Sequence, residues 1–135
     1  SYIIKSANVY WFDKDKGYIC TFSGIIFKSQ LAHLFHSGDS RIYRLSSDRL
    51  EQLTSDHRRI VSEDTSYLTR ALGIHDYLEL DYRQIPLSEG DIYILASDGV
   101  YESLDNKQLL DIIKQEDNLI QYYLMIPIKI YVWNF

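Results

Sequence analysis

The stretch that decides the fold is Ile-Tyr-Ile-Leu-Ala-Ser-Asp-Gly-Val-Tyr-Glu, residues 92–102. Its first five residues form an apolar run of strand-forming types, and the run leads directly into Asp98 and Gly99. Because glycine lets the backbone turn sharply, the stretch predicts a strand that presents a carboxylate at its end. The alternative is an ordinary Asp-Gly turn without a ligand, which such dipeptides commonly form.

A second stretch repeats this arrangement. Residues 31–36 form another run that reads as a strand, and it leads into Gly38 and Asp39. Either unit alone is weak evidence, since an acidic residue beside a glycine is common in plain turns. Two such units in one small chain indicate a site that is built from carboxylates.

Length and composition describe an ordinary folded chain. With 135 residues, 46% of them hydrophobic, the sequence predicts one domain over residues 1–135 with a core of its own. The net charge of -5 and the scattered basic residues argue against a nucleic-acid surface. Cys20 is the only cysteine and is interpreted as a buried core thiol, in keeping with a reducing compartment. The apolar tail at residues 119–135 is interrupted and too short to span a membrane, so we expect a cytoplasmic protein without membrane insertion.

Hydrophobic periodicity predicts the order of the elements. Strands outnumber helices, and the strands that follow one another along the chain are joined by short polar turns. This pattern favours an α+β layered fold. The expected elements are a helix over 2–12, a hairpin of 18–27 with 31–37, a hairpin of 41–45 with 50–53, a surface loop or short helix over 54–66, strands over 78–85 and 91–96, and a helix over 103–114.

Four segments together resemble the metal-dependent protein phosphatase 2C family, in matching order and spacing. The resemblance extends from about residue 9 to residue 113 and is closest to bacterial domains that are fused to, or encoded beside, a Ser/Thr kinase. The four segments are GDSRIYRL (38–45), LTSDH (53–57), LTRALG (68–73) and GDIYILASDGVYE (90–102).

The resemblance implies a fold, an activity and a cofactor. The fold is an antiparallel β-sandwich flanked by helices, and the activity is hydrolysis of phosphoserine and phosphothreonine in signalling proteins by water that two metal ions activate. The implied ions are Mn²⁺ or Mg²⁺, hard cations that prefer oxygen ligands. The implied partners are a phosphorylated protein substrate and a cognate Ser/Thr kinase.

The resemblance also implies metal ligands, whereas it assigns no catalytic side chain to this chain. Asp98 matches an aspartate that binds one of the two core metals, and Asp39 matches one near an additional, weaker metal position. Glu102 lies where the family often has an aspartate that faces the same outer ion. The alternatives are a helix-capping or turn role for Asp98, a hydrogen-bonded turn for Asp39 and a solvated surface role for Glu102.

The remaining charged and imidazole side chains are given structural interpretations. Arg41 and Arg70 are expected to form ion pairs rather than to bind phosphate. His57 is expected at the surface rather than as a general acid. His33 and His36 are expected on one partly exposed face of a strand, rather than as a pair of metal ligands.

The chain departs from the family pattern at both ends. The Asp-Gly-x-Gly-Gly turn that should precede Gly38 is not found, and Asp117 is too close to Asp98 to begin the family's last strand. We therefore expect a partial domain that has little activity alone and that self-associates through unpaired sheet edges. The alternative is a non-catalytic regulatory or binding module that retains the phosphatase scaffold. A small nucleotide- or phosphate-binding domain is a third, weaker reading.

Overall fold

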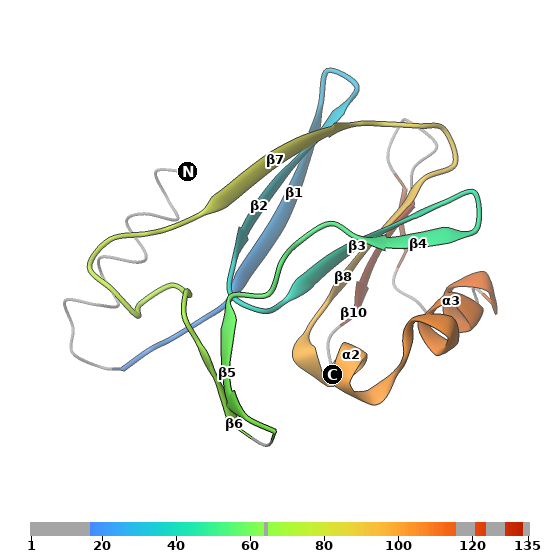
Figure 1. The fold of residues 1–135 in the computed structure, drawn as a ribbon. Helices are drawn as coiled ribbons and strands as arrows, with labels where there is room; N and C mark the ends of the chain where they lie inside the picture. Colours follow the sequence, from blue (N-terminus) through green and yellow to red (C-terminus); the bar gives the residue numbers. More distant parts are fainter. Residues whose placement is uncertain (1–16, 64, 116–120, 124–128, 134–135) are drawn as a thin grey trace. The chain divides into compact units, whose positions relative to one another are not determined.

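The computed structural model describes residues 17–63, 65–115, 121–123 and 129–133, and these fall into two compact units (Figure 1). The first unit comprises Ser1–Asp39 and Asp56–Ile85, and the second comprises Ser40–Ser55 and Pro86–Phe135. The helix that we expect over residues 2–12 lies outside the described residues.

A three-stranded sheet forms the larger part of the first unit, in the order β1-β2-β7 (Figure 1). Its strands are β1 (Phe22–Lys28), β2 (Leu31–Ser37) and β7 (Asp81–Pro86). β1 and β2 pair antiparallel and confirm the first predicted hairpin. Its two-residue loop has positive φ angles of 52° at Ser29 and 59° at Gln30, which is the backbone of a type I′ turn.

The first unit also contains a two-stranded hairpin, β5 (Arg58–Ser62) with β6 (Thr65–Leu68). The prediction of a surface loop or short helix over residues 54–66 was therefore wrong. Most side chains of this hairpin are exposed, including Ile60 at 77%. Because neither strand has one buried face, its sequence does not show the alternation of apolar and polar residues by which a strand is predicted.

A five-stranded sheet forms the second unit, in the order β4-β3-β8-β10-β9 (Figure 1). β8 is central, pairs antiparallel with β3 and parallel with β10, and so has neighbours on both edges. The predicted hairpin and the predicted strand after residue 91 are confirmed. The strands are β3 (Arg41–Ser46), β4 (Arg49–Gln52), β8 (Ile92–Ala96), β9 (Gln121–Tyr123) and β10 (Lys129–Trp133).

Two helices follow β8 along the chain: α2 (Asp98–Ser103) and α3 (Asn106–Gln115). α3 confirms the predicted helix, with a start that is fixed by reciprocal hydrogen bonds. The Gln108 amide donates to Asp105 Oδ1 at 2.8 Å, and the Asp105 amide donates to Gln108 Oε1 at 2.9 Å. This exchange satisfies two backbone donors at the helix start. α2 was not predicted separately, because six residues are too few to show a helical period.

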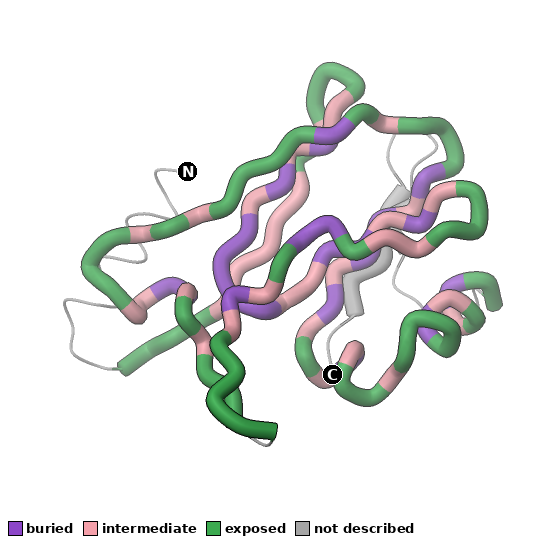
Figure 2. Tube along the Cα trace, in the orientation of Figure 1, coloured by how far each residue is buried: buried purple, intermediate pink, exposed green. Residues whose placement is uncertain are grey.

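The hydrophobic core of the second unit joins residues of β3 and β8 to residues of both helices. Figure 2 shows the buried positions along the chain in purple. The strands contribute alternate residues of one face, and each helix contributes the side chains that point at the sheet. The members are Tyr43, Leu45, Ile94, Ala96, Val100, Leu109 and Ile113. The helix that begins at Asp98 is thus fixed to the sheet by buried apolar surface.

Two other expectations concern solvent and membrane. Cys20 is exposed, so its interpretation as a buried core thiol was wrong. It forms an isolated backbone bridge with Leu72 before β1 begins. Among the described residues, no helix is long and apolar enough to cross a membrane.

Candidate metal centre

Asp98 stands at the junction between β8 and α2, where the sequence places a carboxylate. Ser97 separates the strand from the helix, and Asp98 is the first helical residue. Its side chain is exposed, and its Oδ1 accepts a hydrogen bond from the Gly99 amide at 2.9 Å. A carboxylate is favoured in the first turn of a helix, where backbone N–H groups create a positive potential.

Glu102 lies one turn further along α2 and is also exposed. Residues four positions apart lie on the same face of a helix, so Asp98 and Glu102 face the same side of α2. The helix therefore places these two of the three predicted ligands on one face.

The orientation of α2 is fixed from both of its sides. Val100 is fully buried in the core, and the ring of Tyr101 lies under the Arg41 guanidinium at 3.5 Å from the ring centroid. Arg41 also donates from Nη1 to the Tyr43 hydroxyl at 3.1 Å. An ion pair for Arg41 stays a prediction, while these contacts make it a clamp on the helix that carries Asp98.

A buried charge pair fixes the start of β8. Asp91, which precedes the strand, is 1% exposed, and its Oδ2 lies 2.8 Å from Nη2 of Arg44 on β3. The same oxygen accepts from the Ser88 amide at 3.1 Å. Burial raises the pKa of nearby Tyr93 to about 12; Arg44 lowers this pKa and Asp91 raises it. β8 is thus held at its start by Asp91 and after its end by the packing of α2, which begins with Asp98.

Asp39 belongs to the first unit and is placed differently from the other two candidates. It follows β2, is 5% exposed, and its Oδ2 lies 2.9 Å from Nε of Arg58. The carboxylate is therefore engaged with a cation of the chain itself. Both the metal role and the hydrogen-bonded turn that were considered for Asp39 stay predictions.

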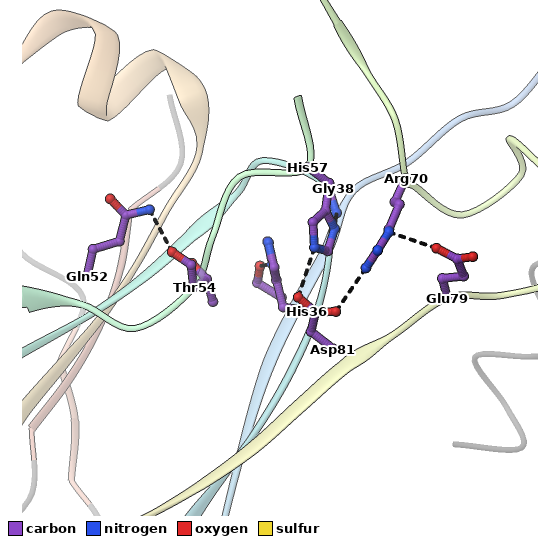
Figure 3. A network of polar contacts seen from close by, with 9 residues as sticks. His36, Gly38, Gln52, Thr54, His57, Arg70, Glu79 and Asp81 are labelled. Carbon is purple, nitrogen blue, oxygen red and sulfur yellow. Dashed lines mark hydrogen bonds and ion pairs between the residues drawn. The ribbon is translucent and has the colours of Figure 1, made fainter. Parts of the chain in front are cut away.

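His57 is buried, at 8% exposure, so the prediction that it lies at the surface was wrong. Its Nδ1 accepts from the Gly38 amide at 3.1 Å, and its backbone amide donates to the Gly38 carbonyl at 2.8 Å. Because Nδ1 is an acceptor, the ring proton is on Nε2, which donates to Asp81 Oδ2 at 2.9 Å (Figure 3). Gly38 and Asp81 are far from His57 in sequence, so no local pattern could have revealed these contacts.

Asp81 is in turn held by Arg70, which confirms the ion pair predicted for that arginine. Nη1 of Arg70 lies 3.0 Å from Asp81 Oδ1, and its Nε lies 2.7 Å from Glu79 Oε2 (Figure 3). Both carboxylates and the guanidinium are partly exposed, so each pair contributes little stability alone. Their effect is to orient the imidazole of His57.

The prediction that His33 and His36 share one partly exposed strand face was wrong. Successive strand residues alternate between faces, so positions 33 and 36 point to opposite sides of β2. His36 is 2% exposed and bonds through Nδ1 to the Ser23 hydroxyl at 2.9 Å. His33 bonds instead to the Tyr82 hydroxyl at 2.7 Å. That they are not a pair of metal ligands stays a prediction.

The donor chemistry on α2 fits Mn²⁺ or Mg²⁺, which take oxygen ligands. Asp98 and Glu102 offer carboxylate oxygens from an exposed helix face, and these residues would hold the ion. The number of donors is small: the described residues contain no group of three or more His, Cys, Asp or Glu side chains that could hold a metal ion. In the part of the chain that the structure describes, the role of Asp98 and Glu102 as metal ligands stays a prediction.

Comparisons with known proteins agree with the resemblance. The serine/threonine phosphatase Stp of Listeria welshimeri is 32% identical in an alignment of 112 positions that covers 72% of this chain and 44% of that protein. PppA, a key regulatory component of T6SS in Pseudomonas aeruginosa, has 26% identity and a TM-score of 0.79 over 84% of this chain and 54% of its own. The catalytic domain of the serine threonine protein phosphatase PstP in complex with two manganese ions has 28% identity and a TM-score of 0.69, over 82% of this chain and 53% of its own. No family model matches the chain.

These structures and the mostly antiparallel sheets show a fold of protein phosphatase 2C type, which confirms the predicted fold class. The curated relatives are bacterial serine/threonine phosphatases, and the chain is similar to a part of them. The chain spans about half the length of the relatives that it matches.

Proposed function

We propose that this chain is part of a metal-dependent phosphatase that hydrolyses phosphoserine and phosphothreonine in proteins. One observation carries the proposal. The chain has the fold of a catalytic domain that binds two manganese ions, and it presents Asp98 as an exposed carboxylate at the end of the central strand β8. The ion pair at the strand start, the buried Val100 and the contact of Arg41 with Tyr101 hold the elements that carry this carboxylate in place.

In this proposal the residues of the chain hold and orient, and the chemistry is supplied by the ions. Bound Mn²⁺ or Mg²⁺ would lower the pKa of a water molecule and neutralise charge on the phosphoryl group. Asp98 would be the principal ligand of the chain and Glu102 the second, on a longer side chain. With so few donors, the chain alone should bind the ion weakly and leave it largely hydrated. We therefore expect little turnover from this polypeptide by itself.

The finer assignments belong to the same proposal. The substrate would be a phosphorylated protein, the phosphatase would act in the cytoplasm opposite a cognate Ser/Thr kinase, and residues 1–135 would form part of one domain. The ion pair between Asp39 and Arg58 favours a second candidate, a non-catalytic module that keeps the scaffold. In that case Asp98 would serve only to begin α2.

The test is to place the chain in a complete catalytic domain. Residues 17–115 would replace the aligned stretch of the Listeria welshimeri phosphatase, and phosphate release from a phosphothreonine peptide would be measured with and without Mn²⁺. The graft would be compared with Asp98→Ala and with Asp111→Ala, which removes an exposed carboxylate from α3 and serves as the matched control. Circular dichroism and cooperative melting would establish that each variant folds.

We expect Mn²⁺-dependent turnover that Asp98→Ala reduces by about a hundredfold or more, while Asp111→Ala leaves it unchanged. A folded graft that is inactive, or one that is active without Asp98, would contradict the proposal. The first of these results would support the non-catalytic module.

A further inference from the structure

The side chain of Asp39 is 7% exposed and already faces a cation, the guanidinium of Arg58, whose side chain is 30% exposed. Their closest atoms, Oδ2 and Nε, are 2.9 Å apart. The two groups carry opposite charges, and the carboxylate is largely removed from solvent, so the contact is an ion pair that is screened little by water. A divalent cation that approaches Asp39 would have to displace this guanidinium.

Backbone hydrogen bonds of the neighbouring residues hold Arg58 close to Asp39. The preceding residue, His57, bonds to both the amide and the carbonyl of Gly38, the residue that precedes Asp39. The His57 carbonyl also accepts from the Thr69 amide at 2.8 Å, which ties this segment to the chain beyond β6. His57 is thus bonded to Gly38, and the residues that follow them, Arg58 and Asp39, form the ion pair. The backbone bonds hold the guanidinium close to the carboxylate.

The imidazole ring of His57 is itself held in one orientation. Asp81 accepts from Nε2 of His57, and Arg70 holds Asp81 with Glu79 on its other side (Figure 3). Asp81 orients the His57 ring, and the ring accepts a hydrogen bond from the Gly38 amide. The residues that follow His57 and Gly38 are Arg58 and Asp39, which form the ion pair. The Asp39–Arg58 contact is thus a built part of the first unit rather than a chance encounter of flexible side chains.

We propose that Arg58 is an internal cation that occupies Asp39 and competes with a divalent metal ion for this carboxylate. The inference rests on the proposed function in one respect, since it supposes that the phosphatase meets Mn²⁺ or Mg²⁺. A metal ion beside Asp39 would face the positive guanidinium at short range and would find one oxygen already engaged. In this chain the carboxylate is therefore closed to metal until Arg58 moves, in contrast to the weak metal position that the family resemblance implies.

The neighbouring Arg59 provides a matched control. It also lies in β5 and carries the same charge, yet its side chain is exposed, and among the described residues no ion pair with Asp39 includes it. Replacement of either arginine by glutamine changes the net charge of the chain by the same amount. A difference between the two variants therefore reports the local contact and not the overall charge.

The experiment is a Mn²⁺ titration of the chain, in which electron paramagnetic resonance counts the free aqueous ion. We expect Arg58→Gln to strengthen Mn²⁺ binding or add a site, by about tenfold to a hundredfold in affinity, the range that one charged contact governs. Arg59→Gln should behave as the parent chain. Arg58→Lys, which keeps a cation near Asp39, should stay closed, and Asp39→Asn in the Arg58→Gln background should remove the gain. Thermal melting would show that each variant is folded.

An equal change in the Arg58→Gln and Arg59→Gln variants, no change in either, or a gain that survives Asp39→Asn would overturn the inference. The same titration in an Asp98→Ala background separates it from the proposed function. Loss of the parent site with retention of the Arg58-dependent site would support both. A parent site that is unaffected by Asp98→Ala would contradict the role of Asp98 and leave the competition at Asp39 standing.

Discussion

Replacement of Gly38 by alanine should destabilise the chain strongly, because the turn that leads to Asp39 has no room for a side chain. Gly38 has φ = +119°, a region that residues with a Cβ rarely adopt. A Cβ at this position would lie 2.5 Å from Thr21 Cγ2, 2.6 Å from Thr21 Cβ and 3.0 Å from Thr21 Cα. The last of these atoms is backbone, so rotation of the threonine side chain cannot relieve the clash.

Two costs add for this substitution. Backbone strain at an unfavourable φ is worth about 1–3 kcal/mol, and overpacking of a filled site about 1–3 kcal/mol. We therefore expect Gly38→Ala to lower the free energy of unfolding by about 2–6 kcal/mol, a large share of the roughly 5–15 kcal/mol of a typical domain. Gly17→Ala is the control, since Gly17 also has positive φ (+61°) but nothing within 4 Å of its Cβ position. It should cost only the strain of about 1–2 kcal/mol.

Urea unfolding followed by far-ultraviolet circular dichroism would measure both variants. Thr21→Ser removes Cγ2 while it keeps the hydroxyl, and in the Gly38→Ala background it should recover part of the loss but not all of it. If Gly38→Ala costs no more than Gly17→Ala, the described packing of this turn is incorrect, and the placement of Asp39 that depends on it fails as well.

Three further predictions concern the second unit. Asp91→Ala leaves Arg44 without its buried counter-charge and should cost about 3–5 kcal/mol in chemical unfolding, whereas loss of the carboxylate of Asp48, which is 80% exposed, should cost less than about 1 kcal/mol. Because burial raises the pKa of Tyr93 from 10.0 to about 12, stability should be constant with respect to this group below pH 10 and fall by about 3 kcal/mol as the pH rises to 12. In Tyr93→Phe the free energy of unfolding should fall by that much less between pH 10 and pH 12. An equal fall in the parent chain and the variant would refute this prediction. Asp105→Ala removes the reciprocal bonds at the start of α3 and should lower the melting temperature, at a cost of about 1 kcal/mol; an unchanged melting temperature would show that the cap is not needed.

Much of the sheet structure could be predicted because its signals are local. The hairpins around Ser29 and Ser47 follow from apolar runs that are separated by short polar turns, although neither turn has a glycine in its loop. β5 and β6 could not be predicted in this way, since strands that are exposed on most positions have no hydrophobic alternation. β7 begins at Asp81, three residues after the predicted start at residue 78, because the alternating pattern continues into the irregular segment before it.

The candidate site shows the same division between local and remote information. The position of Asp98 after β8 could be predicted from consecutive residues of the sequence, and the structure places it there. The pairing of Asp39 with Arg58 and the burial of His57 depend on residues that are 19 positions away, for example in the bond from Gly38 to His57. Residue type alone gave the wrong solvent exposure for His57 and for Cys20, since a polar side chain can be buried when remote partners satisfy it and an apolar run can end at the surface.

The claim at the centre of this account is that Asp98 binds a divalent ion, and paramagnetic broadening by Mn²⁺ in ¹H–¹⁵N spectra of the chain tests it most directly. Substoichiometric Mn²⁺ should broaden first the amide signals of residues 97–102, around Asp98 and Glu102, and Asp98→Ala should abolish this selective loss. Broadening that is uniform, that begins at the exposed carboxylates of Glu79 and Asp81, or that persists around α2 without Asp98 would contradict the claim.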